Sequence, residues 1–77
     1  SLPVNHAAQA RLQPLAFEEL SQHVGDRIVV TTIYGDRHEG KVEQVVGSTL
    51  RLRSSPAMGY AIVNFERSKL RSITSLE

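Results

Sequence analysis

The strongest constraint on the fold is the segment of residues 25–45, GDRIVVTTIYGDRHEGKVEQV, which holds two strand-forming runs separated by a turn. The first run, RIVVTTIY, consists almost entirely of β-branched and aromatic residues, which favour extended strands. Gly35 and Asp36 are typical of a tight turn, because glycine adopts a positive φ at little cost. Gly40 interrupts the second run and removes a side chain where a strand must bend sharply. The segment therefore predicts a hairpin that curls around a core.

Three further short strands are predicted after this hairpin. Residues 49–53 alternate leucine with arginine, which places Leu50 and Leu52 inward and both arginines outward. Residues 66–69 are expected to form a tight turn, of 3₁₀ type, before the last strand. The same alternation predicts that Glu39, Lys41 and Glu43 share one face of the second strand, with Gly40, Val42 and Gln44 on the other. The five expected strands cover residues 27–34, 37–46, 49–53, 60–65 and 70–75.

A short helix is predicted ahead of the sheet, over residues 14–24. Phe17, Leu20 and Val24 lie at positions i, i+3 and i+7, which is one face of an α-helix. Pro14 is compatible with the first turn of that helix. Because so short a helix is unstable alone, we expect it to pack on the sheet, with Phe17 as the large apolar side chain in the core.

Length and composition indicate one small folded domain. The chain has 77 residues, of which 40% are hydrophobic, and this is enough for a small domain with its own core. We predict a tail or linker over residues 1–13 and the β domain over residues 14–77. Because the chain begins with serine, we expect it to be either processed or excised from a longer protein. It is then one domain of that protein or a self-assembling subunit. No run of eighteen apolar residues occurs, so we expect no membrane insertion in this segment.

The formal net charge is only +1, but the charges are unevenly distributed. Residues 1–26 carry a net charge of −2, and residues 27–77 carry +3. Five basic residues follow position 50, on elements that lie near one another in small barrels, and we predict that they form one basic strip that attracts phosphates. Stacking aromatic residues, which single-strand binders usually add, are limited to Tyr34 and Tyr60. The basic strip consists of Arg51, Arg53, Arg67, Lys69 and Arg71.

The sequence contains no arrangement typical of a catalytic or metal site. His6, His23 and His38 lie in three different predicted elements without ligand spacing, and there is no cysteine. The serines lie outside any G-x-S-x-G turn, and no phosphate-binding glycine loop occurs. We therefore expect a protein that is not an enzyme and that holds neither a cofactor nor a metal.

The order of helix, strands and glycines resembles the Sm-like family, which comprises the LSm proteins and the bacterial Hfq relatives. The resemblance rests on VGDRIVVTTIYGDRHEGKVEQV, TLRLR and the final KLRSI, and it covers residues 15–76, with Gly35 and Gly40 at the two shared glycine positions. It implies a helix followed by five bent strands. It also allows the ring assembly of that family, in which the fourth strand of one subunit pairs with the fifth strand of the next. SH3-like barrels share much of the same pattern.

The residues with which Sm-like proteins grip RNA are not matched. The loop between the second and third strands, VVGST, lacks the Asp and Asn of the family, and the last segment, NFERSKLRSI, lacks its glycine. The Tyr-Lys-His segment of the Hfq relatives is also absent. The resemblance therefore implies a fold and allows an oligomer, but it carries over no binding site.

These patterns together predict a mainly β protein: a five-stranded, strongly bent antiparallel small barrel of Sm-like or SH3-like type with one N-terminal helix. The expected function is that of a non-catalytic interaction module. Its partner is expected to be a protein segment or another copy of the chain, in a homo-oligomeric ring for instance, bound through an open strand edge. The alternative is an RNA-binding Sm-like ring that uses the basic strip.

Overall fold

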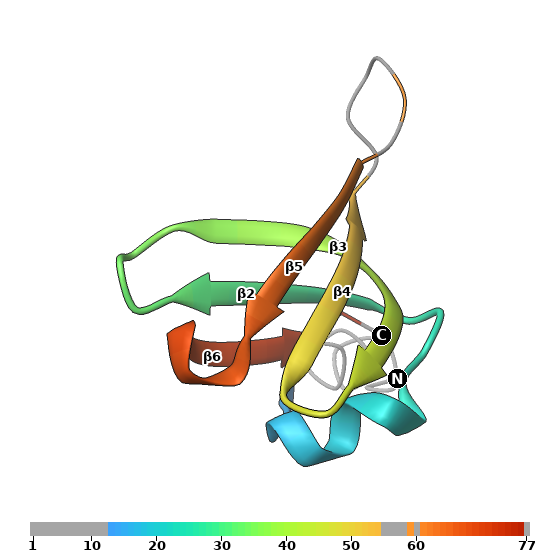
Figure 1. Ribbon diagram of the computed structural model, residues 1–77, viewed down its shortest axis with the longest axis horizontal. Helices are drawn as coiled ribbons and strands as arrows, with labels where there is room; N and C mark the ends of the chain where they lie inside the picture. Colours follow the sequence, from blue (N-terminus) through green and yellow to red (C-terminus); the bar gives the residue numbers. More distant parts are fainter. Residues whose placement is uncertain (1–12, 55–58, 60, 77) are drawn as a thin grey trace, which may run out of the picture.

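The hairpin predicted around Gly35 forms the centre of an antiparallel sheet in the computed structural model, which describes residues 13–54, 59 and 61–76 (Figure 1). Its strands are β2 (Arg27–Thr32) and β3 (Arg37–Val46), and Gly35 has the positive φ, 92°, that this turn requires. The described sheet is open and has the order β1-β6-β2-β3-β4-β5. Its other strands are β1 (Gln13–Pro14), β4 (Thr49–Ser54), β5 (Ala61–Glu66) and β6 (Leu70–Ser75).

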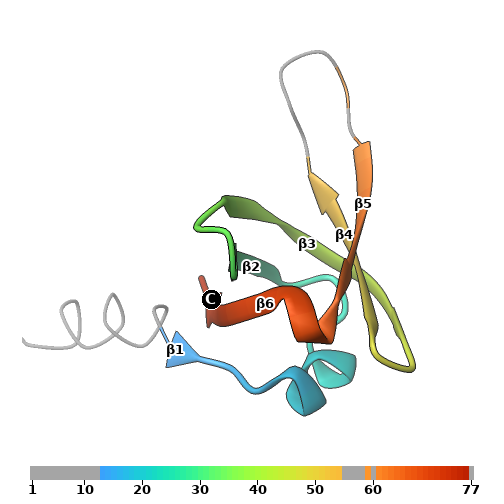
Figure 2. The ribbon, with the colours of Figure 1, turned by 60° about the vertical axis from the view of Figure 1, so that its left-hand side comes forward.

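The prediction of a mainly β, antiparallel fold is confirmed, but the predicted number of five strands is wrong. The described sheet has a sixth strand, β1, which pairs with the far side of β6 (Figure 2). A strand of two residues has no alternation of apolar and polar residues, so no sequence pattern indicated it. Of the predicted tail, residues 1–12 lie outside the described part of the chain, while Gln13 belongs to β1.

The predicted α-helix over residues 14–24 is also wrong: a 3₁₀ helix, η1, occupies Phe17–Gln22 instead. The sheet holds the chain on both sides of it, because Leu15 N donates to Ile73 O (2.8 Å) and Gly25 N donates to Val42 O (2.8 Å). Only six residues between these two attachments are helical, and 3₁₀ helices are typical of such short pieces.

The tighter winding of η1 changes which side chains face the sheet. With three residues per turn, Phe17, Leu20 and His23 lie on the same side. Leu20 is completely buried, while Phe17 and His23 are half-buried. Val24, which the α-helical spacing placed on the buried face, is 55% exposed. The main apolar anchor of η1 is therefore Leu20, and Phe17 lies at the margin of the core.

The core fills the space between η1 and the inner face of the sheet. Leu50 and Leu52 of β4 point into it and are 0% and 1% exposed, as the alternation of TLRLR predicted. Every described strand except β1 contributes to this core. Its buried members are Leu20, Ile28, Val30, Val42, Leu50, Leu52, Phe65 and Ile73.

The predicted faces of β3 are correct up to Glu43 and fail at Gln44. Gly40 and Val42 are buried and Glu39, Lys41 and Glu43 are exposed, but Gln44 is exposed as well. The register against β4 shifts between Val42 and Gln44, so the strand holds an irregularity that moves its later residues to the opposite faces.

The remaining predicted elements are confirmed with small shifts of their ends. β2 is two residues shorter than predicted, and Ile33 and Tyr34 are exposed in the turn that follows it. The second 3₁₀ helix, η2 (Arg67–Lys69), occupies the predicted turn. The fourth predicted strand begins at Ala61 because Tyr60 lies outside the described residues, as does most of the loop before it.

Candidate interaction surface

β5 is the last strand in the order of the described sheet, so only one of its sides has a neighbour. It pairs with β4 along its whole length, from Thr49–Glu66 to Ser54–Ala61. In Figure 2 the hairpin of β4 and β5 rises away from β1 and β6. Within the described part of the chain, the outer side of β5 is therefore an open strand edge.

The backbone groups on this open side follow from the hydrogen-bond alternation of antiparallel strands. Arg67 N donates to Ser48 O (2.8 Å), which continues the ladder between β5 and β4. Counting back along the chain from Arg67, the backbone groups of Phe65, Val63 and Ala61 therefore face β4. The backbone groups of the residues between them face outward. We call the outward-facing backbone of Ile62, Asn64 and Glu66 the β5 edge. It offers three N–H and three C=O groups to a further strand.

The side chains of β5 do little to block a further strand. Natural edges are commonly protected by lysine, proline or a bulge. β5 has no lysine or proline, its register with β4 is regular, and its one charged residue is Glu66 at the end. Val63 is 37% exposed on the same face as the buried Phe65. An apolar side chain is thus left partly uncovered beside the β5 edge.

Glu66 holds this end of the strand against the turn between β3 and β4. Its carboxylate oxygens accept hydrogen bonds from Thr49 Oγ1 (2.6 Å) and Ser48 Oγ (3.2 Å). Together with the backbone bond from Arg67 to Ser48, these contacts fix β5 relative to β4. The β5 edge therefore belongs to a strand that is hydrogen-bonded to β4 along its length and to the β3–β4 turn at its C-terminal end.

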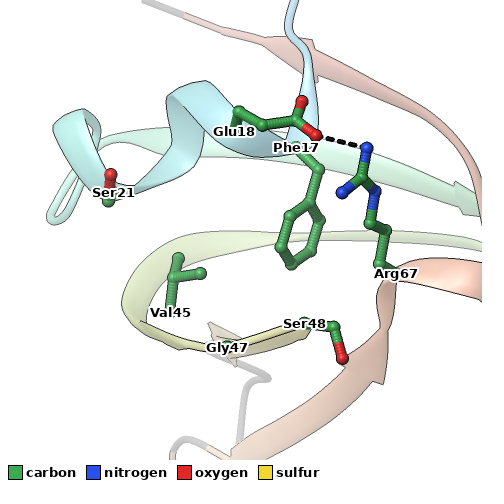
Figure 3. Close-up of a pocket in the computed structure, with 7 residues that line it drawn as sticks. All are labelled: Phe17, Glu18, Ser21, Val45, Gly47, Ser48 and Arg67. Atoms are coloured by element: carbon green, nitrogen blue, oxygen red, sulfur yellow. Dashed lines mark ion pairs between the residues drawn. The ribbon is translucent and has the colours of Figure 1, made fainter.

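A cleft of about 490 Å³ lies between η1 and the turn that joins β3 to β4 (Figure 3). The ring of Phe17 extends from η1 toward that turn, and Glu18 forms an ion pair with Arg67 across one end of the cleft. The Arg67 guanidinium also lies 5.7 Å from the centroid of the Phe17 ring. Because the Arg67 guanidinium already contacts Glu18 and the Phe17 ring, an anionic ligand in the cleft has to compete with the Glu18 carboxylate for it. The cleft is lined by Phe17, Glu18, Ser21, Val45, Gly47, Ser48 and Arg67.

The structure distributes the five residues of the basic strip over three elements. Arg51 and Arg53 lie on the outer face of β4, which β3 and β2 separate from β6 in the sheet order. Arg67 and Lys69 lie in η2, and Arg71 is exposed on β6. Lys69 Nζ donates to the hydroxyl of Tyr34 (3.3 Å) rather than pointing toward β4. Their role in binding RNA stays a prediction.

Sequence reasoning missed a different grouping of cations, which crosses three strands. In the register of the sheet, Arg27 lies opposite Lys41, and Lys41 lies opposite Arg53. Directly opposite residues of antiparallel strands share a face, so these three residues form one row, which we call the basic row. Glu39 and Glu43 form ion pairs with its two arginines. The hairpin turn at Gly35 already pairs Arg27 with Lys41, so that half of the row was readable from the sequence.

Two of the three histidines lie in the described chain, and each has a structural contact. His23 Nδ1 lies 3.0 Å from a carboxylate oxygen of Asp26, and the ring of His38 lies 5.0 Å from that of Phe65. His6 falls outside the described residues. Among those residues, no group of three potential metal ligands occurs. No helix in the same part of the chain is long and apolar enough to span a membrane.

Comparison with known proteins gives no relative: no family model, no curated protein and no solved structure matches the chain significantly.

Proposed function

We propose that this domain is a non-catalytic interaction module that binds a further β-strand along the β5 edge. The observation that carries this proposal is the open side of β5, where no described strand shares the backbone donors and acceptors of Ile62, Asn64 and Glu66. A strand added there gains main-chain hydrogen bonds and covers Val63. The partner is either a segment of another protein or a second copy of the chain.

We also propose that the fold is a small barrel of Sm-like type. A short helical segment is followed by five strands, β2 to β6, and β6 returns to pair with β2. Gly35 and Gly40 lie in the turn after the first of these strands and within the second, as in the Sm-like pattern. These features support the assignment without supplying an RNA site.

Strand addition is tested by NMR titration of the isotope-labelled chain with two extended peptides. One alternates valine with threonine, and the other has the sequence of residues 59–68. We expect the largest shifts at the amides of Ile62, Asn64 and Glu66. The same peptides with N-methylated amides cannot donate the ladder bonds and serve as controls. Equal shifts with the methylated peptides, or shifts confined to the cleft beside η1, contradict the proposal.

A second candidate function is the binding of a single-stranded nucleic acid by the outer face of the sheet. The basic row favours it, because three cations on neighbouring strands form a band that follows a phosphate backbone. The two acidic partners, Glu39 and Glu43, weaken this field. Nucleic-acid binding therefore ranks below strand addition.

A further inference from the structure

The opposite side of the sheet is much less open than the β5 edge. Leu76 N donates to Arg27 O (3.0 Å), which sets the alternation along β6 and directs Ile73 and Ser75 away from β2. Both positions are covered: Ile73 O accepts from Leu15 N, and Ser75 pairs with Gln13 of β1.

The rest of that side is blocked by two further features. β1 ends at Pro14, which has no N–H to offer to another strand. At the other end of β6, the register against β2 shifts between Thr31 and Thr32, so β6 holds an irregularity at Arg71 that interrupts its ladder. Among the described residues, the β6 side therefore lacks a continuous row of backbone groups for a β5 strand from a neighbouring copy.

This difference between the two sides determines how copies of the chain can join. Head-to-tail assembly into a ring or filament needs both sides of the sheet, whereas a twofold dimer needs the same open edge twice. We propose, on the basis of the function proposed above, that two copies associate antiparallel through their β5 edges about a twofold axis. Asn64 of one copy then lies opposite Asn64 of the other.

In this register every outward-facing backbone group of the β5 edge has a partner, and the side chains that meet are compatible in polarity and charge. It pairs Ile62 with Glu66 of the partner copy, so all three outward residues are hydrogen-bonded. Val63 comes to lie opposite Phe65 of the partner copy, which covers its exposed surface. No like charges lie opposite each other along the strands. Glu66 approaches the partner's Ile62, whose neighbour on β4 is the cationic Arg53.

Complementary charges at position 64 test both the dimer and its register. Light scattering coupled to size-exclusion chromatography should give the wild-type chain twice its 8.5 kDa mass. Asn64→Lys and Asn64→Asp should each weaken the dimer by about tenfold or more, because each places two like charges opposite one another. An equimolar mixture of the two variants should recover the dimer. Gln44→Lys adds the same charge in the same row of the sheet, two strands from the edge, and should leave the dimer intact.

Several outcomes overturn the dimer. A wild-type chain that stays monomeric at millimolar concentration overturns it, and so does a closed ring of more than two copies. A mixture of the two variants that stays monomeric overturns the self-pairing of residue 64. If a variant is misfolded by circular dichroism, amide exchange of the wild-type chain decides instead. Exchange at Ile62, Asn64 and Glu66 must then slow as the protein concentration rises, and concentration-independent exchange contradicts the dimer.

The peptide titration separates this failure from a failure of the proposed function. A monomeric chain that binds the extended peptides at the amides of the β5 edge retains its role as a strand-binding module and loses only the second copy as its partner. A monomeric chain that binds neither peptide loses both.

Discussion

The main-chain oxygen of Arg53 lies where a side chain at position 40 would begin. A Cβ atom on Gly40 would stand 2.5 Å from that oxygen and 3.1 Å from Cγ of Leu52. Contacts of 2.5 Å between these atoms do not occur in folded proteins, so β3 and β4 can approach this closely only because residue 40 is glycine. The shape of the sheet at this point depends on that single residue.

Replacing Gly40 with alanine should therefore destabilise the fold by about 1–3 kcal/mol, the usual range for an extra methyl group in a filled site. The obstacle is backbone, which cannot turn aside as a flexible side chain does. Urea unfolding followed by circular dichroism measures the change. Gln44→Ala, on the exposed surface of the same strand, should change the free energy of unfolding by less than about 0.5 kcal/mol. Equal stability of the two variants would show that β3 and β4 can separate at no cost.

The role of Gly40 shows what the sequence could predict about the fold. A glycine in a run of strand-forming residues is a local signal, and so are the turn at Gly35 and the leucine–arginine alternation of β4. The bounds of β3 were predicted correctly for this reason. β1 and the irregularity after Val42 were missed, because each depends on which strand lies alongside. The partner of β1 lies about sixty residues away in the chain, and an extra residue in β3 leaves no signal of its own in the alternation of so polar a segment.

The structure of η1 gives the second prediction. Leu20 is completely buried, whereas Val24 is 55% exposed. Leu20→Ala should cost about 2–5 kcal/mol, the range for a leucine removed from a core, and Val24→Ala should cost less than about 0.5 kcal/mol. Phe17→Ala should fall between them, since Phe17 is half-buried. Thermal and urea unfolding of the three variants provide the ranking. A large loss at Val24 would instead indicate the α-helical spacing that the sequence predicted.

The ion pair between Glu18 and Arg67 gives the third prediction. Both side chains are more than half exposed, so their interaction should contribute only about 0.2–1 kcal/mol. A double-mutant cycle with Glu18→Gln and Arg67→Gln measures the coupling energy in low salt. The coupling should nearly vanish at 1 M salt, where the screening length falls to about 3 Å. A coupling that persists at 1 M salt would show that Glu18 and Arg67 interact through more than screened charge.

The candidate sites show a different limit of sequence reasoning. Exposure of Arg51 and Arg53 follows from alternation within one strand, and the structure agrees. Whether they lie near Arg67, Lys69 and Arg71 depends on the order of the strands in the sheet, which the sequence does not give. That order places β2 and β3 between β4 and β6. The sequence predicted an open strand edge without saying which strand forms it. The structure identifies that strand as β5, which among the described strands pairs with β4 and no other.

The basic row gives the last prediction, which tests the binding of a single-stranded nucleic acid. If the outer face binds oligo-U, affinity should fall steeply with salt, and Lys41→Ala combined with Arg53→Ala should flatten the salt slope by roughly 1.4, about 0.7 for each lost phosphate contact. Lys69→Ala combined with Arg71→Ala removes the same charge from elements outside the row and is the matched control. Fluorescence anisotropy at several salt concentrations measures both. The row is the site only if its double variant loses more affinity than the control. Equal losses indicate attraction to overall charge, and an absence of binding at low salt excludes this function.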